Sequence, residues 1–367
     1  MKAVCHREAL LSAGQLASVA VSSRDVKPIL RNLKLSVQPD RCIVMATDLE
    51  LGIRMEVRSI QVEEPGDAIF PATTLISILR ESTDEQLRLE ADSTVASVRG
   101  ESNEYEIPSE EPDAFPDLPS FDDKVHHEVL AEPLRQMIRR TLFATAKENA
   151  RYAMTGVLWE LEEGKVRLVA TDGRRLAVCE GEATGPKEHV TKGLTHVVPT
   201  KAMSLLERVV QSTQEPVRVC LKANEAMFQT DRATIYSRLV EGRFPDYRSV
   251  LPKRSTAKVS LSVGPFHTAI RQAAVVVDEE TRRLRLNFGQ NRLTLQAQGT
   301  TSGRCKVEMP IDLQGKELSI AFEPSFLTDM LRVLDPSATL TLEMTDGESP
   351  AVFRCGPEYC YIVMPLV

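Results

Sequence analysis

The sequence predicts an α+β protein made of three copies of one domain, and two observations support this class. Runs in which apolar and polar residues alternate are joined by short polar turns, a pattern typical of antiparallel hairpins. These runs recur in a fixed order with segments of helical periodicity, and the order repeats about every 120 residues, a normal domain size. We therefore expect domains at residues 1–121, 122–253 and 254–367, each with two helices packed on an antiparallel sheet.

The clearest repeated element is a strand pair. Residues 29–57 and 152–181 each place alternating runs on both sides of a polar turn and then reach the sequence Ala-Thr-Asp, which ends at Asp48 and at Asp172. Residues 284–303 keep the alternation but lack the Ala-Thr-Asp sequence. We expect a hairpin in each copy.

Two segments with apolar residues at helical spacing accompany each strand pair. The first precedes the hairpin, at residues 7–22, 130–148 and 264–280. The second follows a short strand and a break at or near proline, within residues 69–80, 197–210 and 320–334. Further alternating runs follow the second helix, so strands should outnumber helices.

Proline-rich connectors end the first two copies. Residues 111–120 and 241–252 both contain Phe-Pro-Asp, as Phe115-Pro116-Asp117 and Phe244-Pro245-Asp246. Proline fixes φ and removes a backbone donor, so neither segment reads as an ordinary helix or central strand. Such a rigid extended segment either ties two domains together or forms the wall of a binding groove.

Composition narrows the class of protein. The chain is 42% hydrophobic and 26% charged, has no apolar stretch of membrane-spanning length, and shows Arg7 and Glu8 where a signal peptide would be apolar. We expect a cytoplasmic protein. The seven cysteines are dispersed without a C-x-x-C pair, so we expect neither a metal site nor a cofactor. The formal charge of −7 permits a local basic surface on an acidic body.

Catalytic signatures are weak. Asp48 and Asp172 are the candidate carboxylates, but an Asp after a strand more often forms an Asx-turn. The sequence has no G-x-S-x-G, P-loop or H-E-x-x-H motif. It therefore favours a protein that is not an enzyme, and a hydrolase or transferase using one of these carboxylates is the alternative.

Several predicted helices carry basic residues. In the segment 130–148 one face should hold Leu134, Ile138, Leu142 and Thr145, and the opposite face Arg139, Arg140 and Lys147. Other basic positions are Lys201, Arg208, Arg271, Arg282 and Arg283. A charged outer face is usually only solvated. If these helices meet nucleic acid, they meet phosphates, which gives salt-sensitive binding without sequence specificity.

Three apolar segments lie beside charged ones: residues 171–178, 243–251 and 362–367. The last is either a final core strand or, with the other two, a groove for a partner's short peptide, since Met and Pro linings adapt to varied ligands.

The motifs PILRNLKL, ATDLEL, ATDGRRLA, EGRFPDYRSVLP and YIVMPLV resemble those of bacterial DNA polymerase III β subunits, the sliding clamps, in this order along the whole chain. The resemblance implies DNA-clamp domains in a head-to-tail homodimeric ring that encircles duplex DNA and serves as a polymerase processivity factor without catalysis. It further implies as partners the polymerase III α subunit, the clamp loader δ subunit and other clamp-motif proteins, and association with the nucleoid during replication.

The resemblance also implies roles for individual residues. The peptide pocket would use Met154, Thr171, Gly173, Arg174, Arg175, Leu176, Pro245, Val250, Ile362, Met364, Pro365 and Leu366. DNA would be contacted by Arg24, Arg151, Tyr152, Lys201, Arg208 and Arg282. Tyr105 and Ile107 of one protomer would meet Val275 and Val276 of the next.

Some positions depart from the family pattern. Relatives tend to carry Arg where this chain has Thr73, Thr200 and Ser249, and some have Tyr in place of Ala153; Glu348 and Pro350 alter the outer edge of the pocket. A third hypothesis is therefore a peptide-binding adaptor of clamp ancestry that no longer encircles DNA.

Overall fold

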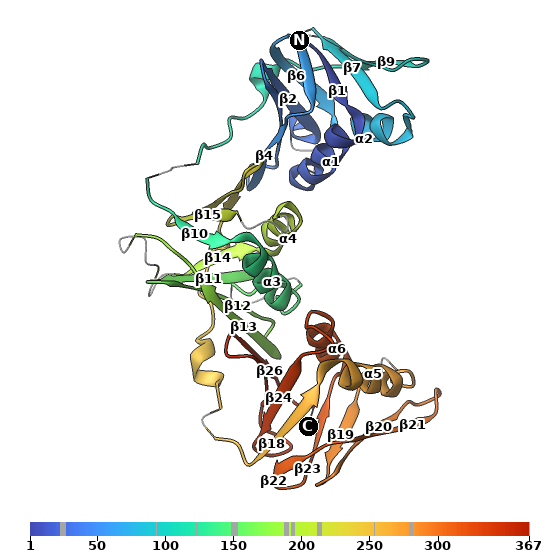
Figure 1. The fold of residues 1–367 in the computed structure, drawn as a ribbon, viewed down its shortest axis with the longest axis vertical. Coiled ribbons are helices and arrows are strands. Elements are labelled where there is room, and N and C mark those ends of the chain that lie inside the picture. The colour runs from blue at the N-terminus through green and yellow to red at the C-terminus, as the bar shows by residue number, and fades with distance from the viewer. Residues whose placement is uncertain are drawn as a thin grey trace. The chain divides into compact units, whose positions relative to one another are not determined.

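The structure is a computed structural model and describes residues 1–22, 27–92, 94–121, 124–147, 153–186, 191, 195–210, 215–252, 254–278 and 282–366. It divides into two compact units. Unit 1 comprises residues 1–132, 183–191 and 201–239, and unit 2 comprises residues 133–182, 192–200 and 240–367. Each unit contains two antiparallel sheets together with helices (Figure 1).

Unit 1 contains an eight-stranded and a five-stranded sheet. The larger has the order β10-β15-β16-β17-β4-β3-β2-β6 and the smaller β5-β1-β7-β8-β9. The bounds are β1 Lys2–His6, β2 Asn32–Gln38, β3 Arg41–Thr47, β4 Leu51–Val57, β5 Ile60–Glu64, β6 Gly66–Pro71, β7 Gln86–Ala91, β8 Val95–Arg99, β9 Glu104–Pro108, β10 His127–Leu130, β15 Pro216–Leu221, β16 Glu225–Gln229 and β17 Ala233–Arg238. Helices α1 (Arg7–Ala17) and α2 (Ala72–Glu81) pack against each other. All but the first residue of α4 (Thr200–Val209) also belongs to this unit.

Unit 2 contains a nine-stranded and a four-stranded sheet. The orders are β14-β11-β12-β13-β26-β25-β24-β18-β22 and β21-β20-β19-β23. The bounds are β11 Gly156–Glu162, β12 Lys165–Thr171, β13 Arg175–Glu182, β14 His196–Pro199, β18 Ala257–Ser262, β19 Leu284–Phe288, β20 Arg292–Gln298, β21 Arg304–Pro310, β22 Leu313–Gly315, β23 Leu318–Phe322, β24 Thr339–Met344, β25 Ala351–Cys355 and β26 Tyr359–Val363. The helices are α5 (Val263–Ala274), α6 (Pro324–Arg332) and α3 (Ala131–Leu142), whose first two residues fall in unit 1.

The predicted hairpins are present. β2 pairs with β3 around Pro39-Asp40, β11 pairs with β12 around Glu163-Gly164, and β19 pairs with β20. Gly164 has φ of 77°, a left-handed conformation that glycine adopts without strain. Alternation of apolar and polar residues therefore identified the strand pairs correctly.

The first helices of the copies are shorter than predicted. α3 ends at Leu142, not near residue 148, and Thr145 lies beyond it, where its Oγ1 donates to the Leu142 carbonyl at 2.9 Å. α5 ends at Ala274, and the three β-branched residues 275–277 that follow are poor helix formers. α1 ends at Ala17 and continues only as a short 3-10 turn. Apolar spacing alone did not reveal these ends.

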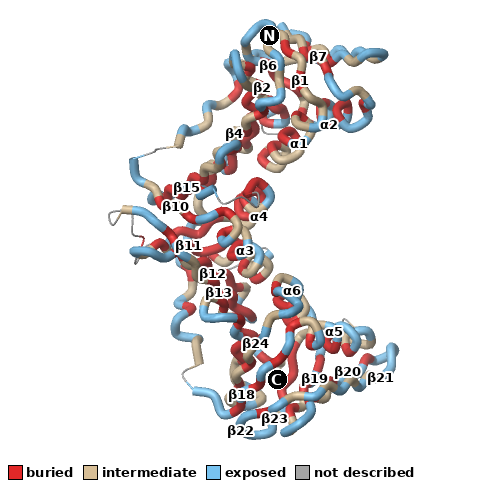
Figure 2. The backbone as a smooth tube through the Cα atoms, viewed as in Figure 1, coloured by how far each residue is buried: buried red, intermediate tan, exposed pale blue. Residues whose placement is uncertain are grey.

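Buried residues concentrate on the strands and on one face of each helix (Figure 2). On one face of the nine-stranded sheet, Trp159, Tyr359 and Tyr361 are almost completely buried. Tyr361 Oη donates to the Phe326 carbonyl of α6 at 2.9 Å, so this face is turned toward the helices. The other face carries the site described below.

Neighbouring copies share sheets, because a strand of one copy pairs with a strand of the next. In unit 1, β17 pairs with β4 from Ala233↔Met55 to Ser237↔Leu51. In unit 2, β13 pairs with β26 from Arg175↔Val363 to Cys179↔Tyr359. Each compact unit therefore combines parts of two copies, and the boundaries at residues 1–121, 122–253 and 254–367 stay a prediction.

Candidate functional site

Asp48 and Asp172, the candidate catalytic carboxylates, each shape a turn. Asp172 Oδ1 accepts hydrogen bonds from the backbone N–H groups of Arg174 and Arg175, both at 3.0 Å. Asp48 Oδ1 accepts the two equivalent bonds at 3.1 and 2.7 Å. The Asx-turn interpretation is confirmed. In the described part of the chain, no group of three or more His, Cys, Asp or Glu side chains could hold a metal ion.

The face of the nine-stranded sheet opposite Tyr361 carries an apolar strip. The register places Leu158 of β11 beside Val169 of β12, and Val169 beside Val178 of β13. Two residues before Val178 on β13, and on the same face, Leu176 lies beside Ile362 of β26. All five of these strip residues are buried in one cluster.

The connector 241–252 covers only part of this strip. Phe244 and Tyr247 pack into the apolar cluster and are buried, and a 3-10 helix follows at Tyr247–Val250. The uncovered part of the strip lies next to the turn 171–176, where a hollow of about 280 Å³ remains. The connector is therefore one wall of an apolar pocket, as its rigid composition suggested.

The pocket unites four separate segments of the chain: residue 154, the turn 171–176, residues 245–250 of the connector and residues 362–364. Its lining residues are Met154, Thr171, Gly173, Arg174, Arg175, Leu176, Pro245, Asp246, Tyr247, Val250, Ile362 and Met364. Asp246 and Tyr247 were not among the expected residues, although their place in the connector could have suggested them. Val250 and Met364 remain 48% and 44% exposed, which leaves apolar surface open at the rim.

Pro365 and Leu366 are not among the lining residues. Pro365 is buried, and the Leu366 backbone joins the four-stranded sheet: its N–H donates to the Ala321 carbonyl at 2.8 Å, and its carbonyl accepts from Arg283 Nη2 at 2.9 Å. This segment thus supplies both a core strand, β26, and part of the pocket lining, while its use by a partner's peptide stays a prediction.

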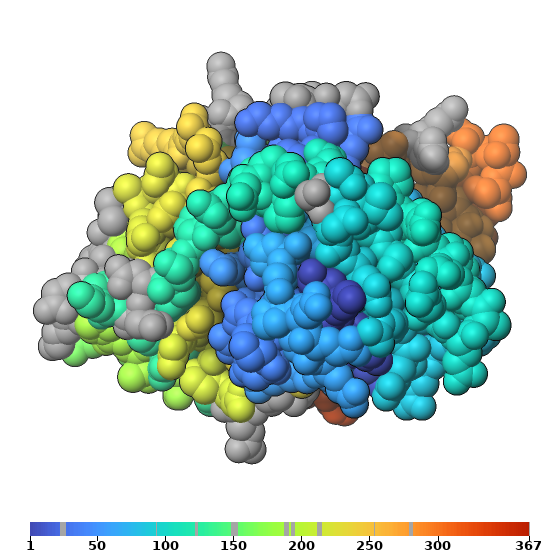
Figure 3. All heavy atoms as spheres, turned by 90° about the horizontal axis from the view of Figure 1, so that it is seen from above, coloured from blue at the N-terminus to red at the C-terminus, as the bar shows by residue number. Residues whose placement is uncertain are grey.

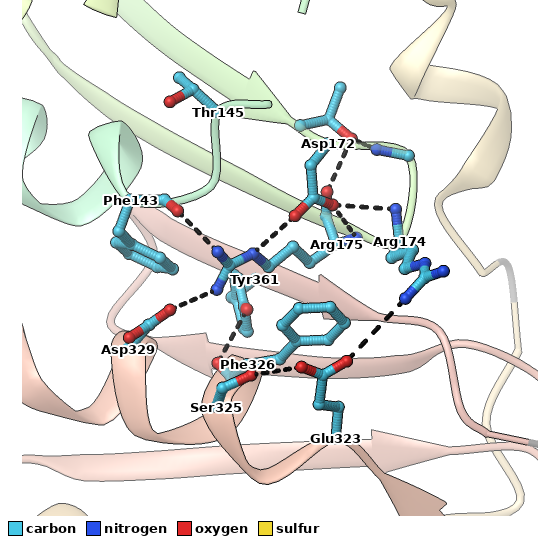
Figure 4. Close-up of polar contacts among 12 residues, drawn as sticks. Phe143, Thr145, Asp172, Arg174, Arg175, Glu323, Ser325, Phe326, Asp329 and Tyr361 are labelled. Carbon is cyan, nitrogen blue, oxygen red and sulfur yellow. Dashed lines mark hydrogen bonds and ion pairs between the residues drawn. The ribbon is translucent and has the colours of Figure 1, made fainter. Parts of the chain in front are cut away.

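Arg175 is the most deeply anchored pocket residue (Figure 4). Only 9% exposed, it donates from Nε to Asp172 Oδ2 at 3.0 Å and from Nη1 to Asp329 Oδ2 of α6 at 2.8 Å. Its Nη2 donates to the Phe143 carbonyl at 2.8 Å, and its guanidinium lies 4.7 Å from the centre of the Phe326 ring. The guanidinium of Arg175 therefore binds groups of the protein itself, and it fixes the turn 171–176 of the pocket to α6.

Burial lowers the pKa of the Arg175 guanidinium, but the neighbouring Tyr361 and the hydrogen bond to Asp329 outweigh it and raise that pKa above its usual value. Arg175 therefore stays charged. Arg174 differs, because its side chain is 68% exposed and its nearest carboxylate oxygen, on Glu323, is 3.9 Å away. Of the two arginines, Arg174 is the one whose charge is available to a ligand.

The corresponding place in unit 1 is filled by the chain itself. There the first connector sends Leu118 over Gly52 of β4, so that a Cβ on Gly52 would lie 2.5 Å from Leu118 Cδ2. Leu118 packs beside Phe115 on the apolar cluster of β3. The same repeated motif thus closes its surface in one copy and leaves a pocket in the next.

Comparisons with known proteins match the whole chain. The family models for the N-terminal, central and C-terminal domains of the DNA polymerase III beta subunit match residues 1–119, 128–246 and 248–366. A beta sliding clamp of Salmonella typhimurium is 30% identical over 373 residues, with 100% of both chains covered. A solved sliding clamp of Pseudomonas aeruginosa, bound to griselimycin, is 28% identical, with a TM-score of 0.92 and 100% and 99% of the two chains covered. The chain belongs to the family of DNA polymerase III β subunits, the sliding clamps.

Membership of the sliding-clamp family settles the class of function. The chain has three clamp domains and is a DNA polymerase processivity factor, not an enzyme. The family tethers polymerase partners to DNA, so the hydrolase or transferase alternative is wrong. Among the described residues, none of the helices has the length and hydrophobicity needed to cross a bilayer.

Among the basic residues expected on helix faces, some are exposed and one is turned toward the sheet. Arg208, Arg271 and Arg282 are exposed. Lys201 is exposed as well, but its Nζ lies 2.6 Å from Asp48 Oδ2. The expectation that Arg140 points outward from α3 is wrong: its Nη1 lies 3.4 Å from Glu358 Oε1, and its guanidinium lies over the Tyr359 ring. Arg24, Arg151 and Tyr152 lie outside the described residues.

Two of the residues expected at a protomer contact lie on an edge strand, and the other two follow helix α5. Tyr105 and Ile107 are on β9, which pairs only with β8 among the described strands, and the teal atoms of this hairpin lie at the right-hand rim in Figure 3. Tyr105 is exposed, whereas Ile107 is 5% exposed and packs inside its own protomer. Val275, just after α5, is 79% exposed, and Val276 is half-buried.

Two of the departures from the family pattern have hydrogen-bond partners within the chain. Thr200 Oγ1 donates to the Thr155 carbonyl at 2.7 Å, and Ser249 Oγ donates to the Asp246 carbonyl at 2.7 Å, so both hydroxyl groups serve the chain itself. Ala153 is buried in the apolar cluster beside the connector. Thr73 is exposed on α2.

Proposed function

We propose that this chain forms a head-to-tail homodimeric ring that encircles duplex DNA without sequence specificity and holds the replicative polymerase by a short peptide seated in the pocket. The observation that carries the proposal is the apolar hollow built from the turn 171–176, the connector and the end of β26. Three domains, at residues 1–121, 122–253 and 254–367, would give a ring of six. The ring would work in the cytoplasm, on the nucleoid during replication.

The pocket suits apolar side chains of a short peptide. Its floor, Leu176 and Ile362, is buried apolar surface, and its rim residues Val250 and Met364 are partly exposed. Burying apolar area supplies affinity, and a rigid wall reduces the entropy lost on binding. The polymerase III α subunit, the clamp loader δ subunit and other clamp-motif proteins would bind here in turn, and griselimycin would occupy the same pocket.

The DNA would be held by phosphate contacts. Arg208 and Arg282 are exposed and suited to this role, and Arg24, Arg151 and Tyr152 are further candidates. Lys201 would exchange its bond with Asp48 for a phosphate. Weak contacts of this kind leave a closed ring free to slide, because retention comes from the topology and not from affinity.

The two sheet edges would form the protomer contacts. β9 and β21 are the outermost strands of their sheets and offer unpaired backbone groups to a second chain. Glu106 of β9 and Arg304 of β21 are exposed charges of opposite sign, while Glu104 and Lys306 already form ion pairs with Arg99 and Glu308 of the same chain. Tyr105 and Val275 would bury their exposed surface at this seam, with Val276 and Ile107 packing behind them.

The peptide-pocket proposal is tested by primer extension with the polymerase and its clamp loader. Val250→Asp places a charge at the pocket rim, so the clamp should still load while the product made per binding event shortens by about tenfold or more, because the site would have to bury an unpaired carboxylate. Leu49→Asp is the control, since Leu49 is an apolar residue of similar exposure that lies in the turn after β3, outside the pocket lining. Equal effects of the two variants, or none from Val250→Asp, would overturn the assignment of the pocket.

A further inference from the structure

Among the described residues, the pocket wall has a backbone attachment at its start, where Ala153 N–H donates to the Arg243 carbonyl at 3.3 Å, and none to the sheet beneath it. In the described residues, the backbone hydrogen bonds of segment 244–252 stay inside the segment: Tyr247 N–H donates to the Pro245 carbonyl at 2.8 Å, and Ser249 N–H to the Asp246 carbonyl at 3.3 Å. Side chains must therefore fix its position. Phe244 and Tyr247 supply apolar contacts, which are not directional.

A row of charged residues crosses the sheet below the wall. The register places Glu160 of β11 beside Arg167 of β12, and Arg167 beside Glu180 of β13. Arg167 Nη1 donates to Glu160 Oε2 at 2.8 Å, and Arg167 Nε donates to Glu180 Oε1 at 2.7 Å. Arg167 thus contacts the Glu160 carboxylate directly, whereas Glu180 bonds only to the Nε of Arg167.

Glu160 is also the point to which the wall is attached. Tyr247 Oη donates to Glu160 Oε2 at 2.7 Å, and Arg248 Nη2 lies 2.9 and 2.8 Å from the two carboxylate oxygens. Arg248 in turn lies over the Tyr247 ring, 4.7 Å from its centre. The Glu160 side chain is only 14% exposed, so these charge-assisted bonds are partly shielded from water.

We propose that Glu160 is a positioning residue for the peptide pocket: it fixes Tyr247 and Arg248, and through them the wall from Pro245 to Val250. This inference rests on the proposed peptide-binding function. Glu160 does not itself line the pocket, whereas Tyr247, Pro245 and Val250 do. Its effect on affinity is therefore exerted through the shape of the wall.

Glu160→Gln tests the proposal, because the amide keeps the size of the side chain and removes its charge. Hydrogen exchange of the full-length chain should become faster in residues 244–251 and stay unchanged in the strands. Binding of griselimycin, measured by calorimetry, should weaken about tenfold, the loss expected for one charge-assisted hydrogen bond. Tyr247→Phe, which removes one donor to the same carboxylate, should change exchange and affinity in the same direction by less.

Glu180→Gln is the matched control, since Glu180 bonds the same arginine but, among the described residues, forms no hydrogen bond with Tyr247 or Arg248. It should leave exchange in 244–251 and griselimycin binding as in the wild type. Equal effects of the two glutamine variants, or wild-type behaviour of Glu160→Gln, would overturn the positioning role. Failure of the wild-type chain to bind griselimycin would count against the pocket itself, while the exchange comparison would still decide the role of Glu160.

Discussion

Arg175 and Asp329 form an ion pair, with 2.8 Å between Nη1 and Oδ2, that joins the turn after β12 to helix α6 directly behind the pocket. The pair links a residue of the second copy to one of the third. The pocket therefore depends on a junction between copies, and not on one copy alone.

Removing one partner of this pair should destabilise unit 2. Asp329→Asn leaves the buried Arg175 charge with less compensation, and we expect a loss of about 2–3 kcal/mol in the free energy of unfolding, measured by urea denaturation. Arg174→Gln is the control, since Arg174 is exposed and 3.9 Å from its partner, and it should cost less than about 0.5 kcal/mol. Similar losses in both variants would contradict a stabilising role for the Arg175–Asp329 ion pair.

Lys201 and Asp48 should have opposite effects on DNA binding. Asp48→Asn keeps the Oδ1 acceptor of the turn but removes the charge held by Lys201, so binding to duplex DNA at low salt should strengthen. Lys201→Ala should weaken it and reduce the slope of log K against log salt by about one. Fluorescence anisotropy across a salt series measures both. A fall in affinity with Asp48→Asn would show that Lys201 does not contact phosphate.

Charge reversal tests the protomer seam. Glu106→Lys on β9 and Arg304→Glu on β21 should each weaken self-association by about tenfold, because like charges would face each other. The chain with both changes should recover much of the lost affinity in sedimentation equilibrium. If the double variant were weaker than either single variant, these two residues would not face each other across the interface.

The stability contributed by Glu160 should depend on pH. Burial raises the pKa of this carboxyl, but hydrogen bonds from Arg167, Tyr247 and Arg248 outweigh it and lower the pKa below its usual value of 4.5. The contribution is present above pH 4.5 and is lost as the pH falls through the lowered folded-state pKa. The difference in unfolding free energy between wild type and Glu160→Gln, measured by urea denaturation, should therefore become smaller as the pH falls below 4.5. A constant difference would contradict this linkage.

The sequence predicted the hairpins and most of the pocket because both follow from local patterns. Alternating residues located β2–β3 and β11–β12, and the apolar segments around Leu176 and Ile362 proved to be neighbours. The ends of the helices were harder to predict. The Thr145 hydroxyl donates to the Leu142 carbonyl at the end of α3, and a contact of this kind leaves the apolar spacing unchanged.

Contacts that depend on tertiary register could not be read from the sequence. Glu160 and Tyr247 are 87 positions apart, and only the pairing of β11 with β12 and the path of the connector bring them together. Arg140 has helical spacing typical of an exposed residue, yet Glu358 from the β25–β26 turn reaches it. Leu118 closes one copy's surface for a reason visible only once Gly52 is placed under it.

Topological retention on DNA tests the central claim most directly. The protein is loaded onto nicked circular DNA with the clamp loader and ATP, the complex is isolated by gel filtration, and the circle is then cut once. A closed ring should stay on the circle and be released on cutting. Equal retention on circular and linear DNA would contradict encirclement, and no retention on either with an active loader would favour the peptide-binding adaptor.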